Sequence, residues 1–269
     1  MIIEETYEVI HAKYGQRLNA VTIEKLVAGV YLTAVKLSTG CSGLASNDLN
    51  SQDSCTHNRN RGFGDFTPGH FKGQKVADLF EIPEPTCFIK TLQLAVMNAL
   101  SAELLAESKF RIIENLDPME LIDFSEKKQV CLVGAFLSYI KKIAASNSVL
   151  NIIELNENAV PDEYRRYFVP SHLSEKAISQ SDVVIITGSS LANNTLDKLL
   201  DVVPEKAKVI LVGPTSGLIP DVLFARGVNI VGATRITDSD KMLELVAEGA
   251  AGFHLFKSCA TKICIVNES

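Results

Sequence analysis

The sequence predicts an α/β protein in which a doubly wound parallel sheet follows a smaller α+β domain. From residue 129 onward, short apolar runs alternate with helix-like segments. Four of these runs end in a glycine or a polar residue, at 130–133, 149–153, 183–187 and 209–212. This alternation is typical of βα units, whose right-handed connections place parallel strands side by side. Before residue 107, short β-rich runs lie between helices, which favours an antiparallel sheet.

We expect the first domain to span residues 1–107. An amphipathic helix is predicted over 3–14, with Gly15 at its end. Three short β-rich runs broken by glycines predict a small antiparallel sheet, at Lys25–Val30, Tyr31–Leu37 and Gly43–Ser46. Two helices are then predicted, at 76–80 and 86–106. The second is apolar on nearly all faces, so we expect it to lie between layers.

The second domain is expected to span residues 108–269, after a polar stretch that contains Pro118. Two further strands follow the four runs above, at 228–232 and 262–266. Helices are predicted between the strands, at 135–145, 173–179, 195–202, 220–226 and 239–248. In an open parallel sheet the turns after the strands meet at one edge, where ligands bind. The sequence therefore predicts where a binding site lies.

Bulk properties restrict the class of protein. The chain has 269 residues, of which 46% are hydrophobic, so it can form a substantial core. Its net charge of −6 argues against a nucleic acid or an anionic membrane as partner. The N-terminus does not read as a signal peptide, and the six cysteines are scattered without CxxC spacing. We expect a cytoplasmic protein with a small-molecule ligand; a homo-oligomer stays open, and the residues specify no cofactor.

The first turn of the predicted sheet combines Gly134 with an acid at the end of the next strand, Glu154. Dinucleotide and adenosyl-cofactor folds use this layout: backbone N–H groups face a phosphate, and the acid accepts ribose hydroxyls. The second and third glycines of GxGxxG are missing, and Phe136 would obstruct a pyrophosphate. The alternatives are therefore a site for another small ligand or a plain strand-to-helix turn.

The second turn, TGSSLANNT at 187–195, is rich in neutral donors and acceptors. Gly188 permits a tight turn, and Thr195 opens the next helix. Asn194 is expected to cap that helix, and capping alone would explain it. Ser189 and Asn193 are thus the stronger functional candidates.

The third turn, VGPTSG at 212–217, repeats this arrangement one strand later. Gly213 begins the turn, and the restricted φ of Pro214 stiffens it. We expect Thr215 and Ser216 to present their hydroxyls toward the cleft, with a merely structural turn as the alternative. The three turns would converge on one cleft.

Two further groups of residues have open interpretations. Asn98 interrupts the apolar helix, and a buried amide needs partners, so it either holds the packing together or faces the cleft. The polar loop at 47–74 offers Cys55, His57 and His70 as soft metal ligands. Arg59 and Arg61 oppose a cation there, and a solvated loop is the alternative.

Essentially the whole chain resembles a bacterial and archaeal family described as putative heavy-metal chelation proteins. The resemblance is carried by Leu132-Val133-Gly134, TGSSLANNTLDKLL (187–200), LVGPTSGLIPDVLFARGVNIVGATRITD (211–238) and LAVMNALS (94–101). It implies an enolase-N-terminal-like first domain and a Rossmann-like, partly methyltransferase-like second domain. It also implies an indirect link to metals, through a small chelator such as a siderophore or pterin. The cleft residues it implies are Gly134, Glu154, Gly188, Ser189, Asn193, Thr195, Gly213, Pro214 and Thr215.

Three hypotheses of function follow. In the leading one, a small polar metabolite or chelator binds between the domains, and whether the protein also condenses, hydrolyses or modifies it stays open. Glu154, Ser189 and Asn193 are the catalytic candidates, with Glu154 orienting a hydroxyl or acting as a base. The alternatives are a non-catalytic metal-binding protein that uses the 47–74 loop, and an S-adenosylmethionine-dependent methyltransferase-like enzyme that uses Gly134 and Glu154.

Overall fold

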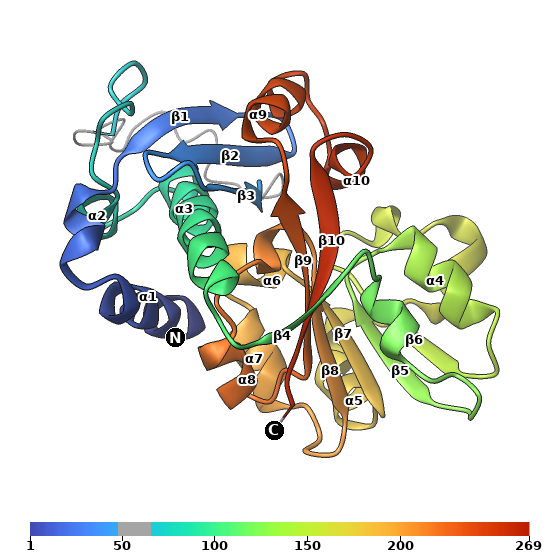
Figure 1. The fold of residues 1–269 in the computed structure, drawn as a ribbon. Helices are drawn as coiled ribbons and strands as arrows, with labels where there is room; N and C mark the ends of the chain where they lie inside the picture. Colours follow the sequence, from blue (N-terminus) through green and yellow to red (C-terminus); the bar gives the residue numbers. More distant parts are fainter. Residues whose placement is uncertain (48–65, 269) are drawn as a thin grey trace.

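Two β-sheets organise the protein in the computed structural model, which describes residues 1–47 and 66–268 (Figure 1). The smaller sheet is antiparallel and holds its strands in sequence order, β1 (Ile23–Ala28), β2 (Leu32–Leu37) and β3 (Ser42–Ser46). The helices of this part are α1 (Ile2–Tyr14), α2 (Val76–Phe80) and α3 (Cys87–Ala106). These elements confirm the predicted small sheet and its three helices, with ends that differ by only a few residues.

The larger sheet has seven strands in the order β4-β10-β9-β8-β7-β5-β6. Five of them are parallel: β5 (Gln129–Val133), β6 (Val149–Ile153), β7 (Val183–Thr187), β8 (Lys208–Val212) and β9 (Ile230–Ile236). All five were predicted, because each is a buried apolar run followed by a polar turn. Side chains of β5 alternate between its faces: Val130 and Leu132 pack in one hydrophobic cluster, Cys131 and Val133 in another.

The sheet is not parallel throughout, and this part of the prediction is wrong. β10 (Ala260–Val266) runs antiparallel to both β9 and β4 (Arg111–Glu114). The chain leaves β9 at its carboxyl end and forms α9 and α10 there, so the next strand must run back along the sheet (Figure 1). β4 has only four residues, too few for its sequence to show a period.

The helices of the larger sheet largely follow the prediction. Those expected are α4 (Leu137–Ala144), α5 (Ser174–Ser179), α7 (Leu196–Asp201), α8 (Asp221–Ala225) and α9 (Ser239–Ala247). Two single-turn helices were not expected, α6 (Ser189–Ala192) and α10 (Gly252–Leu255). The capping role predicted for Asn194 is wrong: its φ is +55°, and Thr195 occupies the position before α7. α6 takes up Ser189–Ala192 and ends before Asn194, so Asn194 lies in the turn between the two helices and α7 begins after Thr195.

One hydrophobic core runs through both parts of the chain. α3 lies beneath the small sheet, and its Leu94 and Leu100 share a cluster with Val184 of β7 and Leu211 of β8 (Figure 1). α3 is long and apolar enough to cross a membrane, but 72% of its apolar window is buried inside the protein. This burial on nearly all sides confirms that α3 lies between layers.

The outer face of the small sheet is covered by the end of the chain. Leu32 and Ala34 of β2 pack against Leu243 and Val246 of α9. Val35, on the opposite face of the same strand, belongs to the cluster that contains α3. β2 is therefore buried on both faces. The face of the small sheet that α3 does not cover is buried by α9, from the second part of the chain.

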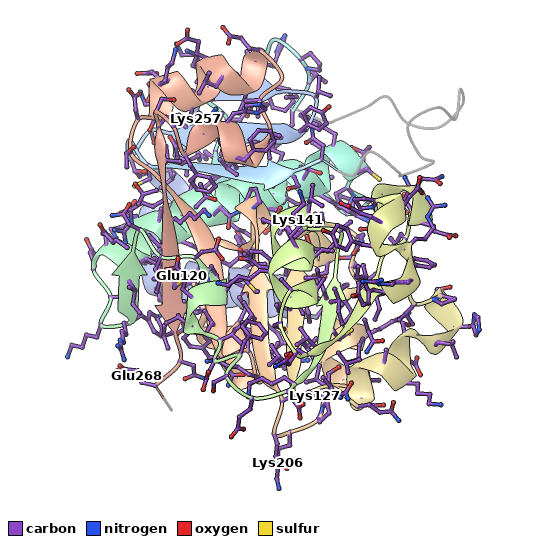
Figure 2. The ribbon with its side chains drawn as sticks, turned by 90° about the vertical axis from the view of Figure 1, so that its right-hand side faces the viewer. Glu120, Lys127, Lys141, Lys206, Lys257 and Glu268 are labelled. Atoms are coloured by element: carbon purple, nitrogen blue, oxygen red, sulfur yellow. The ribbon has the colours of Figure 1, made fainter. Side chains whose placement is uncertain are left out.

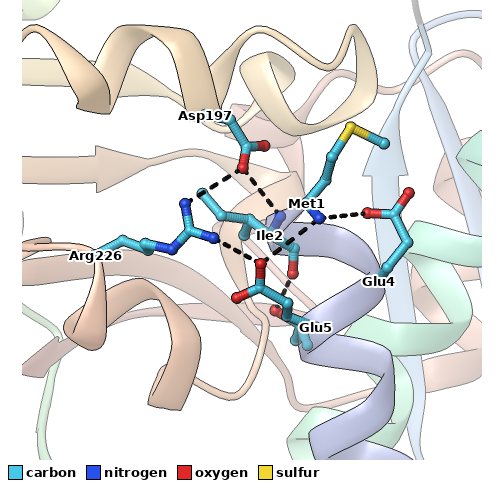
Figure 3. A network of polar contacts seen from close by, with 7 residues as sticks. Met1, Ile2, Glu4, Glu5, Asp197 and Arg226 are labelled. Atoms are coloured by element: carbon cyan, nitrogen blue, oxygen red, sulfur yellow. Dashed lines mark hydrogen bonds and ion pairs between the residues drawn. The ribbon is translucent and has the colours of Figure 1, made fainter.

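α1 is fastened to the second part of the chain by a polar network at its first turn (Figure 3). Asp197 of α7 accepts a hydrogen bond from the backbone N–H of Ile2 at 3.2 Å. Arg226, just after α8, approaches Asp197 at 3.7 Å and donates to Glu5 at 2.6 Å. Asp197 thus serves the N-terminus of α1 as well as the first turn of its own helix. Because these ion pairs are exposed to solvent, they orient α1 but add little to the free energy of unfolding.

Asp117 joins three elements near the start of the larger sheet. Its carboxylate accepts hydrogen bonds from Tyr139 Oη of α4 (2.6 Å), Lys262 Nζ of β10 (2.8 Å) and the backbone N–H of Met119 (3.1 Å). Burial by itself would raise the pKa of Asp117, but the bonds from Lys262, Tyr139 and Met119 outweigh it and lower the pKa below its usual value. The charged form of Asp117 therefore stabilises the fold.

We expect Asp117→Asn to lower the free energy of unfolding by about 2 kcal/mol at pH 7. Because the pKa is lower in the folded than in the unfolded protein, the contribution is complete above about pH 4 and is lost as the pH falls through the folded-state pKa. Urea unfolding from pH 7 to pH 2.5 should show the gap between wild type and variant closing. Asp201→Asn, at an exposed position, is the control and should change little. A gap that stays constant with pH would contradict this role.

Candidate functional site

A cavity of about 440 Å³ opens at the carboxyl ends of β5, β6 and β7. Turns after these three strands form most of its wall, and Ser46 and Asn47, at the end of β3, complete it. Nine of its lining residues carry a hydroxyl or an amide. Glu154 is the only lining residue with a formal charge among the described residues. The cavity therefore lies where an open parallel sheet binds its ligands, and its wall is polar and nearly uncharged.

The opposite edge of the sheet has a different character. A hollow of about 490 Å³ there is lined by lysines and acids together, among them Lys127, Asp182 and Lys206. Figure 2 shows Lys127 and Lys206 at the end of the molecule away from Lys257, which follows α10. Because this hollow lies at the amino ends of the strands, we take the carboxyl-edge cavity as the candidate site.

Gly134 shapes the first turn of the cavity wall. Its φ of +109° is one that other residues rarely adopt. A Cβ atom at this position would lie 3.1 Å from the Cβ of Thr187 and 3.2 Å from the ring of Phe136. The glycine thus lets the β5 turn approach the β7 turn closely, with the Phe136 ring beside it.

Glu154 binds backbone groups of its own protein. Its Oε2 accepts from the N–H of Ala135 at 3.0 Å, and its Oε1 accepts from the N–H groups of Leu155 at 2.8 Å and Asn156 at 3.2 Å. The carboxylate therefore connects the turns that follow β5 and β6. The expectation that Glu154 orients a ligand hydroxyl or acts as a base stays a prediction.

Ser189 and Asn193 line the cavity from the two ends of α6. Thr195, which also lines it, donates its hydroxyl to Asn193 Oδ1 at 2.7 Å, and its N–H approaches the same oxygen at 3.3 Å. These bonds hold the Asn193 amide and turn its oxygen away from a ligand. Within residues 1–47 and 66–268, the Ser189 hydroxyl and Asn193 Nδ2 have no hydrogen-bond partner. They are the groups of this turn that can bind a ligand.

The third turn does not reach the cavity, and the expectation that its hydroxyls face the cleft is wrong. Thr215 and Ser216 are fully buried. Thr215 Oγ1 accepts from the N–H of Ser46 at 2.9 Å, and Ser216 Oγ donates to the carbonyl of Gly232 at 2.6 Å. The small sheet ends against this turn, and buried backbone groups there need partners. The hydroxyls therefore join the two parts of the protein.

Asn98 holds the packing together at the same joint. Its Nδ2 donates to the carbonyl oxygens of Leu44 at 2.7 Å and Thr215 at 3.1 Å, so it links α3, β3 and the third turn. Of the two roles the sequence left open, the contacts favour packing. The candidate ligand-binding residues outside the cavity lining are Asn98, Gly188, Gly213, Pro214, Thr215 and Ser216.

Several lining residues were not among the candidates drawn from sequence. Ser46 and Asn47 are far in sequence from the other lining residues. The only sequence feature that indicated them is the polar stretch that begins at residue 47. Ser171 begins a short helical turn before α5 and Ser174 is the first residue of α5, and the serines of this segment show no pattern in the sequence. Phe136 was considered only as an obstruction. These residues are recognisable as lining once the strand order is known.

The described residues do not form a metal centre of their own. Cys55 and His57 lie outside the described residues. His70 is described, and no group of three or more histidine, cysteine or acidic residues within the described ranges could hold a metal ion. The cavity lining contains neither a thiol nor an imidazole among described residues. Since soft heavy metals prefer such ligands, the cavity does not fit direct heavy-metal binding.

Two family models match the chain. Residues 117–265 match DUF364, and residues 11–101 match DUF4213; both families are described as "putative heavy-metal chelation". The two matches together cover the small sheet and nearly all of the larger one, but leave out β4 (Arg111–Glu114).

Relatives and solved structures agree with these matches. An uncharacterised protein of Methanocaldococcus jannaschii is 28% identical over 190 residues, which cover 70% of this chain and 68% of that protein. A DUF364 protein of unknown function from Pyrococcus horikoshii has a TM-score of 0.77 at 18% identity, with 99% of this chain and all of that chain covered. A second, from Desulfitobacterium hafniense, has a TM-score of 0.68 at 20% identity, with 97% and 99% covered. These structures share the fold.

Proposed function

This chain belongs to the DUF364 family, described as putative heavy-metal chelation, and from that premise we propose that it binds a small polar molecule in the carboxyl-edge cavity. The observation that carries the proposal is the cavity wall, in which hydroxyl and amide side chains from the segments after β6 and β7 meet Ser46 and Asn47, and the β5 turn closes the wall beside them. Its volume of about 440 Å³ is in the range of sites for metabolites. The ligand hydrogen-bonds to the Ser189 hydroxyl and Asn193 Nδ2.

The ligand carries an apolar or aromatic part as well as polar groups. Phe136 and Leu155 line the same cavity, and the side chain of Leu155 is 76% exposed. An exposed leucine beside an aromatic ring offers a surface for a flat ring system, whose polar edge then faces the serines. A pterin-like compound or an aromatic chelator has this division of surface.

Heavy-metal chelation, in this proposal, is a property of the bound molecule. The lining residues do not suit a soft metal ion, whereas hydroxyl and amide donors suit the oxygen and nitrogen atoms of a chelator. An adenosyl cofactor is not favoured, because the Ala135 N–H and the Glu154 carboxylate bind each other. We include in the proposal a Rossmann-like class for residues 108–269 and an enolase-N-terminal-like class for residues 1–107.

The proposal is tested by small molecules and by two cavity variants. Mass spectrometry of molecules released from the purified protein, followed by thermal shift with pterins, catechols and hydroxamates, should identify a compound that stabilises the wild type. Ser189→Ala and Asn193→Ala should each weaken its binding by about fivefold to tenfold, the value of one hydrogen bond. Ser179→Ala, which removes an exposed hydroxyl outside the cavity, should leave binding unchanged. A ligand that binds Ser189→Ala and Asn193→Ala as tightly as the wild type would refute this site.

A further inference from the structure

Glu154 closes a backbone site of the kind that binds anions. Its carboxylate receives three N–H groups: that of Ala135 after β5, and those of Leu155 and Asn156 after β6. Several backbone N–H groups that point at one position form a ready site for a phosphate or a carboxylate. Here the anion at that position is a side chain of the protein itself.

The charge of the remaining wall is consistent with this arrangement. The described lining residues include no lysine, arginine or histidine, so nothing else in the wall would compensate a second negative charge. An anionic ligand group would have to displace Glu154 from its three donors, or lie beside its carboxylate in a partly enclosed site. Charge-assisted hydrogen bonds are about twice as strong as neutral ones, so displacement is costly.

We propose that Glu154 determines the charge class of the ligand: its carboxylate takes the anion position of the cavity, which therefore accepts neutral or cationic molecules and rejects phosphates and carboxylates. The inference rests on the proposed function for the place of the ligand. The claim that Glu154 keeps anions out of the cavity depends only on residues of this protein, so it can be tested with inorganic phosphate and without the natural ligand.

Glu154→Ala should expose the three N–H groups and create an anion site. We expect inorganic phosphate, titrated at constant ionic strength with chloride, to shift the ¹H–¹⁵N resonances of Ala135, Leu155 and Asn156 in this variant. Its affinity for phosphate should be at least about tenfold higher than that of the wild type, in which these resonances should not move. Acetate should act in the same way, because it carries the group that was removed.

Glu157→Ala is the matched control. Glu157 is exposed, lies three residues further along the chain, and does not line the cavity. Its removal changes the net charge by the same amount without uncovering the three N–H groups, so phosphate should still fail to bind there. Phosphate shifts at these residues in Glu157→Ala would show that net charge alone is responsible, and would overturn the inference.

Each of the other possible results also supports or overturns the inference. If Glu154→Ala does not fold, Glu154→Gln keeps the size of the side chain without its charge, and it should bind phosphate more tightly than the wild type. Failure of phosphate to bind a folded variant, or equal binding to the wild type, would overturn the inference. Phosphate binding to Glu154→Ala alone, with no neutral or cationic compound bound by the wild type, would instead uphold the inference and refute the proposed function.

Discussion

Gly43→Ala is expected to lower the free energy of unfolding by about 3 kcal/mol or more, or to prevent folding. A Cβ atom at residue 43 would lie 2.2 Å from the carbonyl oxygen of Ala95 and 2.3 Å from the nitrogen of Ala99. Both are backbone atoms of α3, which cannot move aside as a flexible side chain could. Overpacking of a core costs about 1–3 kcal/mol when side chains can adjust, and here they cannot. Chemical unfolding followed by circular dichroism measures the loss.

Ser42→Ala provides a control in the same strand. The hydroxyl of Ser42 is buried and has no hydrogen-bond partner among the described residues. Replacing it by alanine introduces the same side chain one residue away, without a clash and without breaking a hydrogen bond. We expect stability to be unchanged or slightly higher. Equal losses in the two variants would mean that β3 tolerates no change at all, and that the contact of Gly43 with α3 is not the cause.

Asn98→Leu is expected to lower the free energy of unfolding by about 3 kcal/mol. The substitution keeps the branched shape of the side chain, in a somewhat larger volume, but removes the donor that serves the carbonyl oxygens of Leu44 and Thr215. A buried carbonyl left without a partner costs about 1–3 kcal/mol, and two are affected here. Thermal and urea unfolding measure the loss.

Ser101→Ala separates this effect from a general sensitivity of α3. Ser101 is buried one turn further along the helix, and its hydroxyl accepts one hydrogen bond, from the N–H of Ile219 at 2.9 Å. We therefore expect a smaller loss, of about 1 kcal/mol. An Asn98→Leu variant no less stable than Ser101→Ala would contradict the role of Asn98 at the joint.

These two positions also bear on the cavity. Gly43 and Asn98 hold β3 against α3, and β3 ends at Ser46, whose N–H binds Thr215 Oγ1. Ser46 lines the cavity, so the packing of the joint sets one wall of the site. A variant that loosens the joint should therefore weaken ligand binding even though neither residue touches the cavity.

Elements whose signal is local could be predicted from sequence. α3 and the strands β5 to β8 were placed within a few residues, because a long apolar segment and buried runs that end in polar turns depend only on neighbouring residues. The site edge followed from the same pattern, since the carboxyl ends of parallel strands lie together. β10 was predicted as a strand, but not its reversed direction, because strand direction depends on where the intervening helices pack. β4 was not predicted, because its four residues are too few to show a period.

The local pattern of the chain by itself determined which segments form helices and strands, and that polar turns gather at one edge of a parallel sheet. Only the tertiary structure decided which of those polar groups face a ligand. Thr215 and Ser189 look alike in sequence, yet one is buried against Ser46, 169 residues away along the chain, and the other lines a cavity. Likewise, the sequence presents Glu154 as an acid that is free to bind a ligand. In the structure its carboxylate accepts a hydrogen bond from the backbone N–H of Ala135, in the turn after β5. The physical reason is that the partner of a polar group is chosen by distant segments that fold against it, and no window of sequence contains them.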